Sequence, residues 1–308
     1  MKAVLTIAGS DSSGGAGIQA DLKTIAAHHL FGESVITALT AQNTLGVTGV
    51  LEVDPVFVGT QIDAVFDDIR PDAVKIGMVS SPAIVGAIAD GLDRHKAANV
   101  VVDPVMVATS GSALIADAAV DALVRRLFPR STVITPNIPE AEVLSGMAIA
   151  SLEDVETAAS LIADRCIAVW ENEPAFADAA PSVPAILIKG GHGVGEPDAA
   201  DDYLRMASGE SVWLRGKRIT NDNTHGTGCS LSSAIACGLA RGFAVDVAVR
   251  VGHHCAIPLH TFFQVRSSAR ASVAPTTTVQ EIERLVDGQA VAFLQVALHE
   301  LHHLLRFH

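Results

Sequence analysis

Aromatic and basic side chains are scarce in this sequence of 308 residues. Phe, Trp and Tyr make up 4% of the chain although 49% of it is hydrophobic, so a folded core must be largely aliphatic. Lys and Arg number 21 against 34 Asp and Glu, which gives a formal net charge of -13. Because nucleic-acid-binding proteins normally present a basic face, we expect no nucleic-acid partner. A small anionic substrate remains compatible with this charge, since local cations and helix N-termini can bind it.

Membrane-spanning runs, a secretion signal and paired cysteines are also missing from the sequence pattern. No stretch approaches the roughly 18 apolar residues that cross a bilayer. The opening MKAVLTIAGSDSSGG has too short an apolar run for a secretory signal. The four cysteines form no C-x-x-C pair: Cys166, Cys229, Cys237 and Cys255. We therefore expect a soluble, cytoplasmic protein with reduced thiols and no membrane partner, in which the cysteines other than Cys229 are small core residues.

Short apolar runs alternate with longer amphipathic runs along most of the chain. The apolar runs predict strands at 3–8, 34–40, 72–77, 99–105, 131–137 and 184–191. The amphipathic runs predict helices at 16–29, 55–69, 81–95, 117–128 and 151–167, with two later helices at 226–241 and 245–264. A hairpin is expected at 201–219. This βαβα order indicates an α/β fold: a mostly parallel sheet flanked by helices on both faces, in three layers.

The sequence predicts one large domain followed by an appendage. We place the domain at 1–266, a linker rich in Ala, Ser and Thr at 267–277, and a C-terminal helical extension at 278–308. The irregular stretch 170–184 is interpreted as a surface insertion. The extension contains HELHH (299–303), which matches the H-E-x-x-H spacing of zinc hydrolases. A zinc hydrolase is the weaker interpretation, because the same residues fit an amphipathic helix with a leucine stripe and histidines on its flanks.

Glycine-rich and polar segments follow the predicted strands. They are GSDSSGGAG (9–17), DPVM (103–106), TPNIPEAE (135–142) and KGGHG (189–193). In open α/β sheets, binding sites form beyond the carboxyl ends of the strands, so these segments are expected to converge.

A further motif, NTHGTGC (223–229), opens a predicted helix. Helix N-termini expose unpaired N–H groups, and glycines let an anion approach them closely, although the motif alone also fits an ordinary turn.

Four polar residues in these segments suit phosphoryl transfer, which needs cations for phosphate charge and carboxylates for Mg²⁺. Asp103 and Glu140 are candidates to hold a metal ion or its water. Asn137 and Glu140 are three residues apart at a helix start, so they face the same side. Lys189 ends an apolar strand, where a cation calls for an anionic partner. The alternatives are helix capping or turn formation for Asp103 and Asn137, and an exposed strand end for Lys189.

Together these segments resemble the hydroxymethylpyrimidine/phosphomethylpyrimidine kinases of thiamine biosynthesis, in the ribokinase-like superfamily. The resemblance covers about residues 1–255 and rests on TIAGSDSSGGAGIQADLKT, ITALTAQNTLGV, KIGM, DPVM, TPNIPEAE, IKGGH and NTHGTGC in order. It implies a ribokinase-like three-layer sandwich and a cytoplasmic homodimer. The implied reaction is phosphorylation of 4-amino-5-hydroxymethyl-2-methylpyrimidine, and then of its monophosphate, with ATP as phosphoryl donor and Mg²⁺.

The resemblance also implies roles for single residues. The expected pyrimidine-binding residues are Gly9, Asp21, Gln42, Met78 and Val105. The expected ATP- and phosphate-binding residues are Asn137 and Lys189, and the expected metal-binding acids are Asp103 and Glu140. The expected anion hole is formed by Gly226, Thr227, Gly228 and Cys229. Since a helix N-terminus lowers a thiol pKa, Cys229 is expected either to accept the hydroxyl proton or to position the alcohol.

Two other functions are compatible with this sequence. Pyridoxal kinases share much of this pattern, although Gln42 and Asn43 fit the pyrimidine kinases better. A catalytically weak pyrimidine sensor is the other alternative. It is suggested by the insertion at 170–184 and by the lack of a Gly-Pro-His ending after about residue 260.

Overall fold

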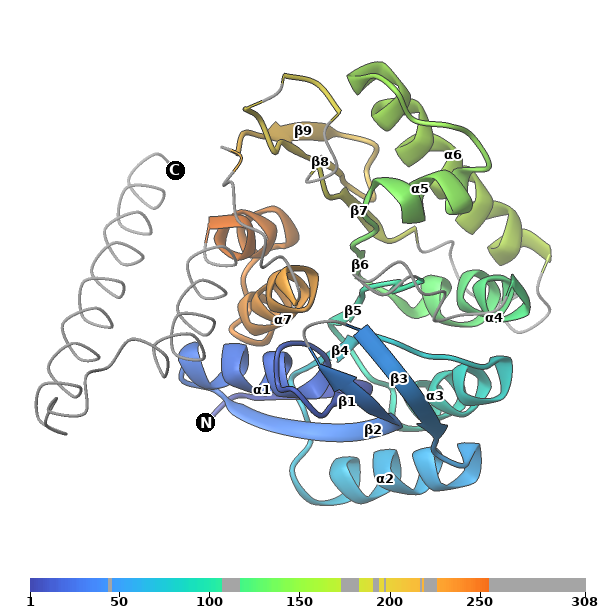
Figure 1. The fold of residues 1–308 in the computed structure, drawn as a ribbon, viewed down its shortest axis with the longest axis vertical. Helices are drawn as coiled ribbons and strands as arrows, with labels where there is room; N and C mark the ends of the chain where they lie inside the picture. Colours follow the sequence, from blue (N-terminus) through green and yellow to red (C-terminus); the bar gives the residue numbers. More distant parts are fainter. Residues whose placement is uncertain are drawn as a thin grey trace, which may run out of the picture.

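The apolar runs form the centre of a twisted sheet with helices on both faces (Figure 1). The computed structural model describes residues 1–43, 46–106, 117–172, 183–190, 194–196, 198–216, 218 and 226–254. Within these ranges the sheet has nine strands in the order β3-β2-β1-β4-β5-β6-β7-β8-β9. Their bounds are β1 Ala3–Asp11, β2 Phe31–Asn43, β3 Gly46–Glu52, β4 Ala73–Ile76, β5 Val100–Val102, β6 Val133–Ile134, β7 Ala185–Ile188, β8 Asp202–Arg205 and β9 Ser211–Leu214.

The sheet is parallel from β2 to β7, and its edges are antiparallel. Strand β3 pairs antiparallel with β2 at one edge, and β8 and β9 form the predicted hairpin at the other. The inner strands are buried on both faces: Val4, Leu5 and Ile7 of β1 are fully covered. Such double burial explains their continuous apolar sequence.

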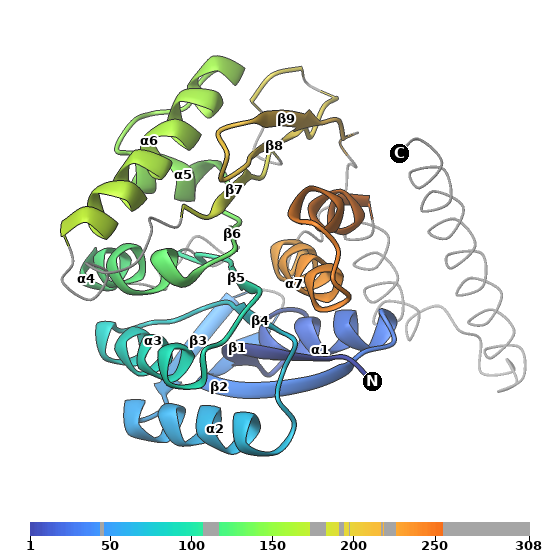
Figure 2. The same cartoon turned by 180° about the vertical axis from the view of Figure 1, so that it is seen from behind.

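Helices cover both faces of the sheet. They are α1 Gly17–Ala27, α2 Pro55–Asp68, α3 Pro82–His95, α4 Asp117–Ala122, α5 Ile138–Ser145, α6 Leu152–Asn172 and α7 Thr227–Ala240, with a further helix at 245–254. One buried cluster joins the sheet to α2 through α6, and a second joins it to α1, α7 and helix 245–254. Figure 2 shows the same two helical layers from behind. The predicted three-layer α/β architecture is confirmed.

Several element boundaries differ from the predicted ones. Strand β3 was not predicted, because its residues are mostly exposed and it exists through pairing with β2. The predicted helix 117–128 ends in a π turn, Leu123–Leu127, and a 3₁₀ turn, Phe128–Arg130, where Pro129 interrupts the α-helical pattern. Helix α6 continues to Asn172, so the first part of the predicted insertion is helical.

Some sequence features lie outside the described residues. They are most of the predicted insertion (173–182), Cys255, the predicted domain limit at 266, the linker 267–277, the extension 278–308 and its HELHH motif. The domain boundaries therefore stay predictions. In the described part of the chain, no helix is both long and apolar enough to span a bilayer.

Candidate active site

Neighbouring parallel strands place several predicted site residues at one edge of the sheet. Met78 follows β4, Asp103 follows β5, Asn137 follows β6 and Lys189 follows β7. Because these strands are parallel and adjacent, the residues that follow them converge at the carboxyl edge, as the sequence predicted. The isolated bridge between Asn137 and Lys189 extends the β6–β7 pairing into the site.

Asp103 and Lys189 form a largely buried ion pair. The Lys189 Nζ lies 2.7 Å from Asp103 Oδ1, and the Thr135 hydroxyl donates to the same oxygen at 3.0 Å. Burial alone would raise the pKa of Asp103, but the charges of Lys189 and Lys75 outweigh burial and lower it. The same attraction raises the pKa of Lys189 against the effect of burial. Both side chains therefore stay charged at neutral pH, and Lys189 is not the exposed strand end that was its alternative.

Asn137 and Glu140 form a capping box at the start of α5. The Asn137 Oδ1 accepts from the Glu140 N–H at 2.9 Å, and Glu140 Oε2 accepts from the Asn137 N–H at 2.8 Å. This pairing satisfies two helix-terminal donors, so Asn137 does cap the helix, which was the alternative to its predicted role in phosphate binding. It leaves Glu140 Oε1 with only a long contact, 3.4 Å, from the Met106 N–H. Burial, together with the charge of Asp103, raises the pKa of Glu140 to about 7, although Lys189 opposes the shift.

The first turn of α7 faces this ion pair. A side chain added at Gly228 would place its Cβ 3.2 Å from Lys189 Nζ and 3.5 Å from Asp103 Oδ2. Helix α7 begins at Thr227, and every residue from Ser230 to Ala240 is buried, so the helix axis is fixed in the core. The N–H groups of the first turn of a helix have no partner within it. A helix N-terminus, a cation and a carboxylate thus meet at Gly228.

Two glycine-rich loops touch at the start of α7. Gly226 has a positive φ of 92°, and a Cβ there would lie 2.0 Å from the Gly15 carbonyl oxygen. The loop 9–17 is shaped by Asp11, whose carboxylate accepts from the N–H groups of Ser13, Gly15 and Ala16. The residues predicted to form the anion hole therefore contact a loop from the opposite end of the described chain. Asn223, Thr224 and His225 of the motif lie outside the described residues.

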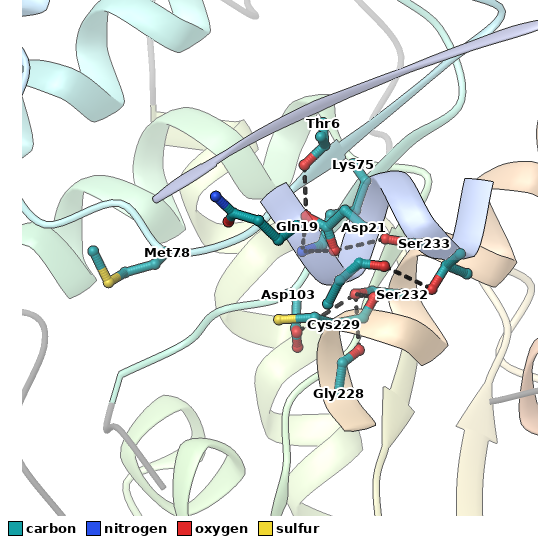
Figure 3. Close-up of polar contacts among 12 residues, drawn as sticks. Thr6, Gln19, Asp21, Lys75, Met78, Asp103, Gly228, Cys229, Ser232 and Ser233 are labelled. Carbon is teal, nitrogen blue, oxygen red and sulfur yellow. Dashed lines mark hydrogen bonds and ion pairs between the residues drawn. The ribbon is translucent and has the colours of Figure 1, made fainter. Parts of the chain in front are cut away.

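Asp21 lies beneath the site and has no exposed surface. Its carboxylate accepts from Lys75 Nζ at 2.8 and 2.9 Å, from the Thr6 hydroxyl at 2.6 Å and from the Ser233 hydroxyl at 2.8 Å. Figure 3 shows these donors around the Asp21 carboxylate, above Cys229 in that view. Asp21, on α1, thus links β1, β4 and α7 through hydrogen bonds, and its predicted role in pyrimidine binding stays a prediction.

Lys75 is the site residue that the sequence analysis did not single out. It is fully buried on β4 and pairs with Asp21, and its charge also acts on Cys229 and Asp103. Burial alone would lower the pKa of Lys75, but Asp21 outweighs burial and raises it. A lone lysine within the apolar run DAVKIG is the same signal that identified Lys189, and it would have identified Lys75 as well.

The pKa of Cys229 contradicts the sequence-based expectation. A lowered pKa was expected from the helix N-terminus, but burial raises the pKa of the thiol to about 11. The Lys75 charge and the Gly17 N–H oppose this shift without reversing it. At neutral pH the group is therefore a thiol, which disfavours a role as general base. In Figure 3 its sulfur points toward the side of the site on which Met78 lies.

Of the remaining predicted pyrimidine residues, Gly9 belongs to the loop 9–17, and Met78 and Gln42 lie beside it. A Cβ at Gly9 would lie 3.0 Å from the Met78 methyl carbon, so these two residues are in contact. The backbone N–H of Gln42 donates to the Ser12 hydroxyl at 2.9 Å, which places the end of β2 beside the loop. Val105 follows Asp103 and is half-buried. Cys166 and Cys237 are buried, as predicted for core residues.

A family model described as phosphomethylpyrimidine kinase matches residues 11–256. A much shorter match, to class-V aminotransferases over residues 232–285, overlaps it. The hydroxymethylpyrimidine/phosphomethylpyrimidine kinase of Rhizobium meliloti strain 1021 is 49% identical over 246 residues, which cover 80% of this chain and 85% of that protein.

Solved structures agree with the family match. The phosphomethylpyrimidine kinase of Clostridium difficile 630 is 42% identical, with a TM-score of 0.67, and covers 82% of this chain and 96% of its own. A Bacillus subtilis pyridoxal kinase, solved as an ADP complex, is 33% identical, with a TM-score of 0.71, over 82% of this chain and 90% of its own. The chain therefore belongs to the phosphomethylpyrimidine kinase family, and it is a kinase of the hydroxymethylpyrimidine/phosphomethylpyrimidine class.

Proposed function

We propose that this chain uses the first turn of α7 to hold the phosphoryl group that it transfers from ATP. The acceptors are the hydroxymethyl group of 4-amino-5-hydroxymethyl-2-methylpyrimidine and then the monophosphate. The observation that carries the proposal is the meeting of three groups at Gly228: a helix N-terminus, the Lys189 ammonium and the Asp103 carboxylate. Phosphoryl transfer depends mainly on positioning and on charge stabilisation, and these groups supply both.

Lys189 and the α7 amides act on the phosphate. The Lys189 ammonium is held by Asp103 at 2.7 Å, so its position is set before a phosphate arrives. The absence of a side chain at Gly228 lets a phosphate oxygen reach the helix amides. Lys75 adds a second positive charge below the same turn. The transferring group is therefore surrounded by donors and cations that need little rearrangement.

Asp103 and Glu140 fit a Mg²⁺ ion that is shared with the nucleotide. Within the described ranges, no group of three or more His, Cys, Asp or Glu residues forms a metal cage. Mg²⁺ commonly uses one or two carboxylates together with phosphate oxygens and water. Asp103 Oδ2 and Glu140 Oε1 each make only long contacts, at 3.5 and 3.4 Å, which leaves them suited to a ligand role. When bound there, Mg²⁺ would neutralise phosphate charge.

The acceptor is proposed to lie between loop 9–17 and the residues that follow β4 and β5. Gly9, Met78 and Val105 offer backbone and apolar contacts to the ring, and the Gln42 amide can pair with its polar edge. Cys229 contacts the accepting hydroxyl as a thiol. In a loose transition state the hydroxyl proton leaves late, so a strong base is not required.

Pyridoxal is the second candidate acceptor. The Bacillus subtilis pyridoxal kinase has a TM-score of 0.71 with this chain, at least as high as that of the phosphomethylpyrimidine kinase structure. The fold therefore suits both acceptors, and only the side chains around the ring can discriminate between them.

The test is ADP release by the purified chain with Mg²⁺ and ATP, with hydroxymethylpyrimidine, its monophosphate and pyridoxal offered separately. We expect turnover with the first two and much less with pyridoxal. Preference for pyridoxal would move the chain to the vitamin B6 kinases. Pyrimidine binding without any turnover would indicate a sensor.

The residue roles are tested by Lys189→Met with Lys2→Met as control. Lys2 forms an exposed pair with Asp72, so its loss should leave kcat unchanged. Loss of one preorganised donor typically costs about 10²–10³ in kcat, and we expect that loss for Lys189→Met. Equal kcat values for the two variants would contradict the role given to Lys189.

A further inference from the structure

His253 makes two hydrogen bonds outside its own helix, 245–254. Its Nδ1 lies 2.9 Å from Asp202 Oδ2, at the start of β8, and its Nε2 lies 3.3 Å from the Arg215 carbonyl oxygen, after β9. The side chain is only 9% exposed. Figures 1 and 2 both place helix 245–254, in dark orange, between α7 and the β8–β9 hairpin. His253 therefore links helix 245–254 to the β8–β9 hairpin through two hydrogen bonds.

The two partners of His253 determine its protonation. A carboxylate oxygen and a carbonyl oxygen only accept hydrogen bonds, so both ring nitrogens must donate. Only the imidazolium carries a proton on each nitrogen. Burial alone would lower the pKa of His253, but the hydrogen bond and charge of Asp202, with the more distant charge of Asp201, raise it. The other ionisable neighbours are the Arg215 side chain, which pairs with Asp201, and His254, whose ring centroid is 5.5 Å away.

The second oxygen of Asp202 reaches the candidate active site. Asp202 Oδ1 accepts from the Gly190 N–H at 2.9 Å, and Gly190 follows Lys189 directly. The two segments are in close contact, because a Cβ at Gly190 would lie 1.8 Å from the Asp201 carbonyl oxygen. On the other side, the Lys189 N–H donates to the Pro136 carbonyl oxygen at 2.9 Å. Asp202 is thus a single carboxylate that connects His253 with the backbone of Lys189 and Gly190.

We propose that His253, as an imidazolium, is a positioning residue that holds Asp202 against the Gly190 amide and thereby fixes Lys189 for phosphoryl transfer. The proposal deepens the proposed function and rests on the role given there to Lys189. His253 lies on a helix that contributes no residue predicted for the site, and its hydrogen-bonded route to the phosphate runs through Asp202, Gly190 and Lys189.

Substitutions at His253 separate positioning from simple loss of stability. Asn carries an amide donor near the position of Nδ1, so His253→Asn keeps the contact with Asp202. Gln carries its donor near the position of Nε2, so His253→Gln keeps the contact with Arg215 and loses Asp202. The control for the His-to-Gln change itself is His95→Gln: His95 Nε2 pairs with Asp63 at 2.7 Å in the other helical layer, and Gln keeps a donor near that nitrogen.

Two readouts are measured on the full chain: amide hydrogen exchange at Gly190, and kcat and KM for ATP. For His253→Gln we expect exchange at Gly190 to be about tenfold faster and kcat/KM for ATP to fall about tenfold, since small displacements of positioned groups cost rate. His253→Asn should stay within about threefold of wild type, and His95→Gln within about twofold. The affinity for hydroxymethylpyrimidine without nucleotide should not change.

Unchanged exchange at Gly190 in His253→Gln would overturn the proposal, and so would equal losses of kcat/KM in His253→Gln and His95→Gln. The exchange experiment needs no turnover, so it still decides whether the linkage exists if the wild-type chain phosphorylates none of the three acceptors. In that case the proposed function fails, and the Kd for ADP replaces the kinetic readout: an unchanged Kd in His253→Gln overturns the positioning role.

Discussion

Replacing Gly226 by alanine tests whether contact between the two glycine-rich loops creates the phosphate site. Gly226 has a φ of 92° and would direct a Cβ to 2.0 Å from the Gly15 carbonyl oxygen. Gly242 has a similar φ of 84°, but a Cβ there would meet no described atom within 4 Å. Both alanine variants carry the left-handed backbone penalty, about 1–2 kcal/mol, and only one carries the overlap.

The overlap determines the size of the expected effect. Real Cβ contacts are essentially never shorter than 3.0 Å, so the Gly15 backbone must move by about an ångström. Overpacking of this kind costs about 1–3 kcal/mol. We therefore expect Gly226→Ala to lower the free energy of unfolding by about 2–5 kcal/mol and Gly242→Ala by about 1–2 kcal/mol.

Activity should separate the two variants further. A displacement of about one ångström at a positioned group can cost about 10²-fold in rate, so kcat of Gly226→Ala should fall about 100-fold. Gly242→Ala should keep kcat within about twofold, because it lies beyond the far end of α7. Urea unfolding and ADP release measure the two quantities. The reasoning is refuted if Gly226→Ala keeps kcat within threefold of Gly242→Ala.

Three further predictions follow from buried charges and thiols. Lys75→Met leaves the buried Asp21 charge without its cation and should lower the free energy of unfolding by about 3–5 kcal/mol. The double variant Lys75→Met/Asp21→Asn should recover much of this loss. No recovery in urea unfolding would contradict the prediction. Because burial raises the pKa of Cys229 to about 11, the rate of its alkylation by iodoacetamide should still rise about tenfold per pH unit between pH 8 and 10. Peptide mass spectrometry measures this rate, and a rate profile with its midpoint near pH 8.5 would contradict the prediction. Asp202 raises the folded-state pKa of His253, so the stabilisation that His253 gives the fold is complete below about pH 6.5 and is lost as pH rises through the folded pKa. The difference in unfolding free energy between wild type and His253→Ala should therefore shrink from pH 6 to 9. A difference that grows over this range would refute the prediction.

Local patterns of the sequence were sufficient for the order of elements and for part of the site. Buried parallel strands need continuous apolar runs, so the runs at β1 and β7 were identifiable without a structure. The capping box of Asn137 and Glu140 depends on residues three apart, which helical geometry brings together in any context. Strand β3 was not identifiable in this way, because it is exposed and depends on its partner β2.

Only the tertiary structure decided which side chains are paired and which protons they keep. Lys75 and Asp21 are 54 residues apart, and no local pattern indicates that they meet in the core. The raised pKa of Cys229 depends on how deeply the first turn of α7 is buried, which the order of residues does not specify. The periodicity of apolar residues that marks helices and strands involves only a few neighbouring residues, so it can be identified from the sequence. Burial and charge act through space, so they are determined only when distant segments pack together.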